Sequence, residues 1–237
     1  AGEPLPVDIV RRCAGRAVRW TDSEALARSI RLVADGKDEF SSLAAWQIEA
    51  LDGLLDALDE TEQSLEEWTD ARQLELLEKM LSAARRIALD RDAEETPRLA
   101  AIRLLARHNR NLENDMTALG ALIVPQNSMR LQAEAIAAMS RHENELVPGL
   151  LLDRWPSAGP IIRGQILDVL LSRETWIEAL FEALESKLLS AAEIDLSRRA
   201  RLLDSRDEEV HRRAAAIFPT PSPTSEERLA RFLAALE

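Results

Sequence analysis

Hydrophobic residues recur at helical spacing along most of the chain. Ile48, Leu51 and Leu55 are separated by three or four positions, which places them on one face of a helix. The same spacing joins Leu74, Leu77 and Leu81, and later Ile162, Ile166, Val169 and Leu170. No segment alternates hydrophobic and polar residues with a sustained period of two. The pattern therefore predicts many helices and no sheet.

The breaks between the helical stretches are short and carry residues that start helices. Side-chain oxygens that can cap free amide groups occur at Thr21–Glu24, Asn127 and Ser128, Ser157, and Thr224–Glu227. Thr96 is predicted to cap a further helix, with Pro97 at its first position. These breaks predict about a dozen helices with short connections, as expected for antiparallel neighbours.

An internal repeat groups the helices into pairs. Ala101–His108 aligns with Ala135–His142, and the same frame continues at Val169–Arg173 and Leu202–Arg206. Successive occurrences are 32–34 residues apart, the length that two helices and two turns consume. Glu208–Phe218 also opens like a HEAT-repeat helix. The sequence therefore predicts an all-α fold, an α–α superhelix of HEAT or ARM type built from antiparallel helix pairs.

The regularity of this repeat predicts how the chain is organised. Residues 1–237 are expected to form a single helical-repeat domain. Residues 1–94 are less regular and include an acidic loop at about 60–71, whereas residues 95–218 carry the regular repeats. Prolines mark a linker at 219–225, and a terminal helix is expected at 226–237.

Charge and cysteine content narrow the classes of partner and site. The net charge is −12, which disfavours binding to nucleic-acid phosphates or anionic lipid and favours solubility. Cys13 is the only cysteine, so the chain has no internal disulfide, CxxC pair, Cys-rich zinc site or CxxCH haem attachment. An inert buried Cys13 is favoured over a thiol activated by the neighbouring arginines. No apolar run approaches the roughly 18 residues of a membrane span.

The sequence contains no recognisable catalytic motif. GxSxG and SxxK motifs and phosphate-binding glycine loops are absent. Paired acids such as Glu66-Glu67 are interpreted as surface or helix-start residues rather than as a glycosidase pair. His108 and His142 occupy the same repeat position, where a structural role near a helix end is favoured over metal binding. We therefore expect no enzyme activity, cofactor or metal in this chain.

Two features are candidates for an interaction surface. The tryptophans are interpreted as core residues, except Trp68, whose acidic and weakly periodic setting predicts exposure. The local positive concentration consists of Arg198, Arg199, Arg201, Arg206, Arg212 and Arg213. These arginines could bind an anionic partner, or they could pair within the fold with the interleaved acids. The second interpretation is favoured, with Asp204, Asp207, Glu208 and Glu209 as partners. The candidate interaction residues are therefore Trp68, Arg198, Arg199, Arg201, Arg212 and Arg213.

The segment Leu151–Glu185, LLDRWPSAGPIIRGQILDVLLSRETWIEALFEALE, carries a family resemblance. With Arg154-Trp155-Pro156, Arg163, Arg173 and Trp176, it resembles the HEAT-like repeat region of large multidomain proteins from planctomycetes and verrucomicrobia. Those proteins join a dehydrogenase-like propeller, a HEAT-like stretch and a C-terminal cytochrome c-type haem domain. The resemblance implies an excised repeat domain, with its redox machinery outside it, and an extracytoplasmic or periplasmic location. By the same resemblance, a haem-dependent dehydrogenase activity would belong to the parent protein alone. Composition by itself leaves a cytoplasmic location open.

Two functional hypotheses follow. The first is a non-catalytic scaffold, spacer or protein-interaction module, whose partners are protein domains of the same or another chain. The second is a HEAT-like protein that binds nucleic acid or another anionic ligand through Arg198–Arg213, as some HEAT-like DNA glycosylases do. The acidic net charge favours the first.

Overall fold

A computed structural model describes residues 12, 16, 23–34, 43–59, 70–107, 111–218 and 233. Within these residues the chain forms eleven α-helices, two short 3-10 helices and no strand. The prediction of an all-α fold with packed helix pairs is therefore confirmed for this part of the chain. The chain divides into two compact units, Ala1–Gln165 and Ile166–Glu237.

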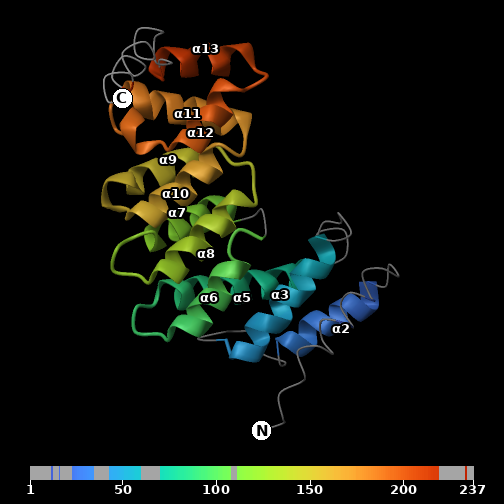
Figure 1. Ribbon diagram of the computed structural model, residues 1–237. Coiled ribbons are helices and arrows are strands. Elements are labelled where there is room, and N and C mark those ends of the chain that lie inside the picture. Colours follow the sequence, from blue (N-terminus) through green and yellow to red (C-terminus); the bar gives the residue numbers. More distant parts are fainter. Residues whose placement is uncertain are drawn as a thin grey trace. The chain divides into compact units, whose positions relative to one another are not determined.

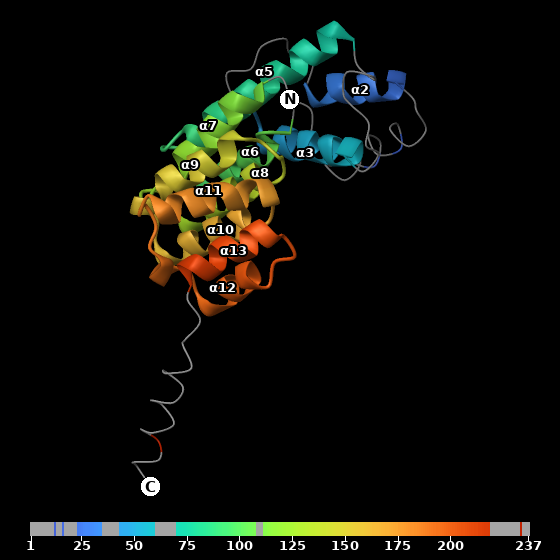
Figure 2. The ribbon, with the colours of Figure 1, turned by 90° about the horizontal axis from the view of Figure 1, so that it is seen from above.

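The first unit arranges its helices in two rows (Figures 1 and 2). Its helices are α2 (Ser23–Val33), α3 (Ala45–Asp59), α5 (Ala71–Leu89), α6 (Glu95–Leu104), α7 (Leu112–Leu122), α8 (Met129–Ser140) and α9 (Leu146–Arg154). One row consists of α2, α5, α7 and α9, each in contact with the next, and the other consists of α3, α6 and α8. Helix α5 also packs on α6, and α7 packs on α8. A short 3-10 helix, Trp155–Ser157, follows α9, and α10 (Pro160–Leu170) crosses the boundary between the units.

The second unit contains α11 (Glu174–Glu185), the 3-10 helix Ala191–Glu193, α12 (Leu196–Leu203) and α13 (Glu208–Ile217). Its core includes the fully buried side chains of Trp176 and Phe181, together with Ile194 and Leu202. Helices α12 and α13 pack against each other. The predicted helix Glu208–Phe218 is thus confirmed to within one residue.

The predicted helix starts are confirmed at some positions and wrong at others. The Ser128 hydroxyl accepts a hydrogen bond from the Leu131 amide at 3.3 Å and caps α8 as predicted. Helix α6, however, begins at Glu95, so Thr96 lies inside the first turn and does not cap it. Pro97 permits this earlier start because amides in the first turn have no intrahelical partner. Ser157 is likewise not a cap but part of the 3-10 helix.

Several sequence predictions fall where the structure has no description. Residues 60–69 of the predicted acidic loop lie outside the described residues, whereas Asp70 caps α5 and Ala71 is its first residue. The predicted linker 219–225 and, apart from Leu233, the predicted helix 226–237 also lie outside them. The single-domain prediction and its internal boundaries remain predictions.

Two tryptophans fill core positions, and an arginine guanidinium lies over the ring of each. Trp155 in the first unit and Trp176 in the second are both buried, which confirms their predicted role. The Arg163 guanidinium lies 5.1 Å from the Trp155 ring centroid, and its Nε donates to the Trp155 carbonyl. The Arg173 guanidinium lies 4.9 Å from the Trp176 ring. Trp46 is half-buried, and Trp20 and Trp68 lie outside the described residues.

A buried carboxylate joins three segments of the first unit. Asp115 of α7 accepts a hydrogen bond from Arg85 Nε of α5 at 2.7 Å and another from the Ala106 amide at 2.9 Å. Ala106 has a φ of 62°, a left-handed conformation that costs energy for a residue other than glycine. Asp115 thus holds the strained end of α6 and pairs with a cation from the neighbouring helix.

Replacing Asp115 with alanine is expected to lower the free energy of unfolding by about 3 kcal/mol, because a largely buried guanidinium and a buried amide lose their acceptor. Urea unfolding followed by circular dichroism measures this loss. Glu113→Ala removes an exposed carboxylate from the same helix and should change stability little. Equal losses in the two variants would contradict the assigned role of Asp115.

Candidate functional site

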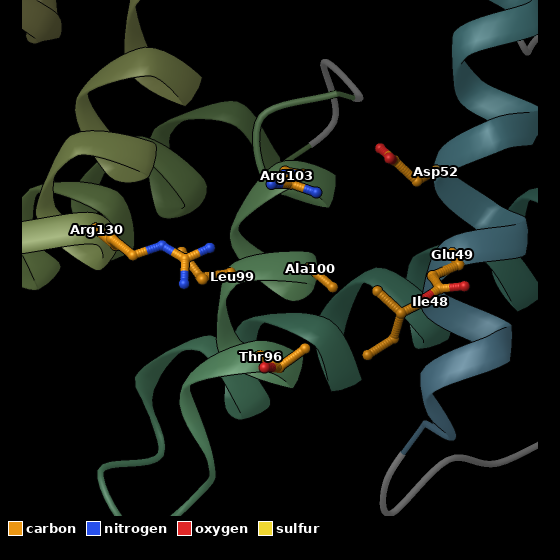
Figure 3. A pocket seen from close by; sticks show the side chains of 8 residues that line it. All are labelled: Ile48, Glu49, Asp52, Thr96, Leu99, Ala100, Arg103 and Arg130. Carbon is orange, nitrogen blue, oxygen red and sulfur yellow. The ribbon is translucent and has the colours of Figure 1, made fainter. Parts of the chain in front are cut away.

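Side chains from α3, α6 and α8 enclose a groove of about 190 Å³ in the first unit (Figure 3). Its floor consists of Ile48, Thr96, Leu99 and Ala100. Its charged lining consists of Glu49 and Asp52 from α3, Arg103 from α6 and Arg130 from α8. The groove thus has an acidic wall on one side and basic side chains on the other.

Helical spacing places these side chains together. Ile48 and Asp52 are four residues apart on α3, so they project from the same face, and Glu49 is adjacent. Leu99 and Arg103 have the same spacing on α6. Contacts of α6 with both α3 and α8 then bring the faces of the three helices together.

One cation joins the acidic wall to the end of α6. Nη1 of Arg107 lies 3.2 Å from Oδ1 of Asp52 and 2.9 Å from Oδ1 of Asp56. The Arg107 side chain is only 7% exposed, which makes this a largely desolvated cluster. Burial raises the pKa of Asp52 above its ordinary value, and the neighbouring Asp56 raises it further. Arg107, Arg103 and Arg141 act in the opposite direction but do not reverse the shift in the pKa.

The basic side of the groove has exposed ion pairs of its own. Arg103 Nε donates to Glu134 Oε1 at 3.2 Å, and this hydrogen bond, with the charge of Glu134, raises the pKa of Arg103. Arg130 Nη1 lies 3.6 Å from Glu95 Oε1, and its side chain is 75% exposed. Pairs of this kind contribute little to stability because water screens them.

The arrangement is suited to binding. It presents anionic and cationic groups across an apolar floor, so a ligand that carries both charges would find a partner for each. No group of three or more His, Cys, Asp or Glu side chains that could hold a metal occurs within the described residues. Among these residues there is also no helix whose length and apolar character would allow it to cross a bilayer.

The predicted interaction arginines lie in the second unit, and most contact groups of the fold. Arg198 Nη2 lies 2.8 Å from Asp168 Oδ2, and Nη1 contacts Asp195, which caps α12. Arg213 lies 2.7 Å from both Glu178 and Glu185.

The other arginines of this set differ in their surroundings. Arg212 pairs with Glu209, and Arg199 Nε donates to the Ile194 carbonyl at 2.6 Å. Arg201 is exposed on α12. The predicted interaction surface remains a prediction for all five of these arginines, Arg198, Arg199, Arg201, Arg212 and Arg213.

The favoured prediction, that these arginines pair within the fold, holds for Arg198, Arg212 and Arg213, but only one of the predicted acids takes part. Within the part of the chain that the structure describes, Glu209 is the one of the four interleaved acids that pairs with an arginine, Arg212, while Asp207 accepts two backbone amides as the cap of α13. Arg198 meets Asp168 of α10 as well as Asp195, and Arg213 meets Glu178 and Glu185 of α11. Sequence distance did not indicate the partners from α10 and α11, because the packing of helices brings their side chains together.

The remaining candidates are a tryptophan and the three histidines. Trp68 and His108 lie outside the described residues. His142 is half-buried, and His211 Nδ1 makes a short contact with the Leu203 carbonyl near the end of α12. No protein-family model matches the chain, and no match was found among curated proteins or solved structures.

Sequence reasoning did not find the groove. Its signals were present as Glu49, Asp52 and Asp56, spaced three and four apart on one helix, and as Arg103 on another helix with Arg107 just beyond its end. Nothing in the sequence showed that these two helices would face each other.

The raised pKa of Asp52 predicts a specific dependence of stability on pH. A carboxyl that binds its proton more tightly in the folded chain loses stability as the pH rises from its unfolded pKa through its folded one. Asp52→Asn removes this loss. The stability of the variant relative to wild type should therefore rise with pH across that window and become constant above it.

Urea unfolding at closely spaced pH values from about 3 to 7 measures this difference. Carbon-13 NMR of the Asp52 carboxyl follows its titration directly. Glu113→Gln, an exposed change on α7, serves as the charge-matched control. A relative stability of Asp52→Asn that falls with pH would show that the Arg107 attraction outweighs burial.

Proposed function

We propose that this chain is a non-catalytic helical-repeat scaffold that binds or spaces protein domains, with its helix pairs arranged as a HEAT-like superhelix. The observation that supports this most is the pair of helix rows in the first unit, in which the packed helices α6 and α8 carry two of the segments that recur every 32–34 residues. In rows of this kind, successive helices present side chains on one shared surface. The groove lies on such a face, formed by α3, α6 and α8.

We further propose that the chain belongs to a larger extracytoplasmic redox protein, a proposal that rests on the resemblance of Leu151–Glu185. Several residues of that resemblance have roles in packing: Arg163 covers Trp155, and Arg173 covers Trp176. The matching positions therefore support a shared repeat fold. They carry no activity onto these residues.

The alternative, recognition of nucleic acid or another anion by Arg198–Arg213, has less support. Binding to phosphates requires protein cations that can replace the counterions condensed on the nucleic acid. Arg198 and Arg213 each contact two carboxylates of their own unit, and breaking those pairs would oppose binding.

The purified chain is expected to be monodisperse and strongly helical, without cofactor absorbance or turnover. Size-exclusion chromatography with light scattering, circular dichroism and visible absorbance test this. Near-stoichiometric bound haem or metal would overturn the scaffold proposal. A CxxCH motif in the same reading frame within some tens of residues beyond Glu237 would support the proposed parent protein.

Fluorescence anisotropy with labelled DNA and RNA separates the two functional hypotheses. The scaffold proposal predicts no binding at low salt, where phosphate contacts are strongest. Salt-dependent binding that is lost on replacing Arg201 and Arg212 with glutamine would instead establish the anion-binding alternative.

A further inference from the structure

We propose that the groove between α3, α6 and α8 binds an extended segment of a partner protein in which a basic side chain lies close to an acidic one. The basic side chain lies against Glu49 and Asp52, and the acidic one meets Arg103 and Arg130. This inference rests on the proposed interaction function and adds to it a site and a partner chemistry.

The distribution of charge in the groove determines the order of these contacts. The two carboxylates of the lining both come from α3, and the two guanidinium groups come from α6 and α8. Figure 3 shows Asp52 projecting from α3 toward the side of the groove where Arg103 lies. A ligand with a single charge would satisfy one side and be repelled by the other.

The size of the groove favours side chains over a small-molecule ligand. Its volume of about 190 Å³ is below the roughly 300–1,000 Å³ of most small-molecule sites. Ile48, Leu99 and Ala100 give it an apolar floor. The aliphatic stem of a lysine or arginine can lie along such a floor while its charged end reaches the acidic wall.

The charges of the lining can exchange partners at little cost. Arg103 and Arg130 form exposed pairs with Glu134 and Glu95, which water already weakens. The surroundings of Asp52 disfavour its negative charge, as its raised pKa indicates, so an approaching cation would stabilise the ionised form. The net charge of −12 further attracts segments that carry a basic residue.

Nuclear magnetic resonance of the full chain, labelled with nitrogen-15, tests the proposal with short peptides. The probes are Lys-Glu, Lys-Gly-Glu and Lys-Gly-Gly-Glu, capped at both ends, which vary the spacing of the two charges. At least one is expected to shift amide signals of α3, α6 and α8. It should bind roughly threefold to tenfold more tightly than capped Lys-Gly-Lys or Glu-Gly-Glu.

Variants that leave the packing intact test each side of the groove. Glu49→Gln and Arg130→Gln remove exposed charges of the lining, and each should weaken the best peptide roughly threefold to tenfold. The matched controls are Glu113→Gln on α7 and Arg28→Gln on α2, whose arginine also forms a long, exposed pair, with Glu24 at 3.8 Å. Both controls should leave binding within about twofold.

The outcomes separate this proposal from the broader one. Peptide-induced shifts confined to other helices, equal effects of groove and control variants, or no binding by any peptide would overturn the groove assignment. A chain that fails these tests but is monodisperse, helical and free of cofactor leaves the scaffold proposal standing. Stoichiometric haem would overturn the scaffold proposal whatever the peptides do.

Discussion

A single pair of helices cannot bury the apolar residues on both of its sides, so each pair in the first unit depends on the next for its core. Small residues make this possible. Ala101 of α6 and Ala135 of α8 are fully buried, and the two helices pack against each other. Between α7 and α9, a Cβ at Gly120 would lie 3.5 Å from the Leu150 side chain, an ordinary contact distance, so the two helices pack directly against each other here. The two helix rows meet this requirement, because each helix packs against a later helix of the same row.

Close packing of the rows creates a second requirement, that polar groups buried at the connections find partners. Arg98, 6% exposed, donates to the Ala88 carbonyl at the end of α5 and to Asn127 in the connection before α8. Asn127 in turn donates to the Leu122 carbonyl at the end of α7 and accepts, through its own carbonyl, from Gln132. This chain of hydrogen bonds joins the ends of successive helices. Burial of the helix faces and satisfaction of the connections therefore reinforce each other.

The parts of this structure that could be predicted from sequence are those determined locally. Helices and their period are visible because side chains three and four positions apart share a face, and the segments aligned at Ala101 and Ala135 do lie at matching places on α6 and α8. Thr96 shows where local reasoning fails, since a helix with proline in its first turn can begin earlier than its strongest capping residue. The groove could not be predicted from the sequence for a different reason. Arg107 and Asp52 are 55 residues apart, and only the packing of α6 on α3 brings them together.

Charges on the row formed by α3, α6 and α8 divide into two classes with different consequences. Arg107 is largely desolvated between Asp52 and Asp56, so loss of both carboxylates would leave a costly unpaired charge, and the cluster holds α3 against the end of α6. The pairs Arg103–Glu134 and Arg130–Glu95 are exposed and add little to stability. Charges that the fold does not need are the ones that a partner can use without unfolding it. The ion pairs of Arg107 join the acidic side of the groove to the end of α6, whereas the basic side consists of arginines whose exposed pairs the fold can lose at little cost.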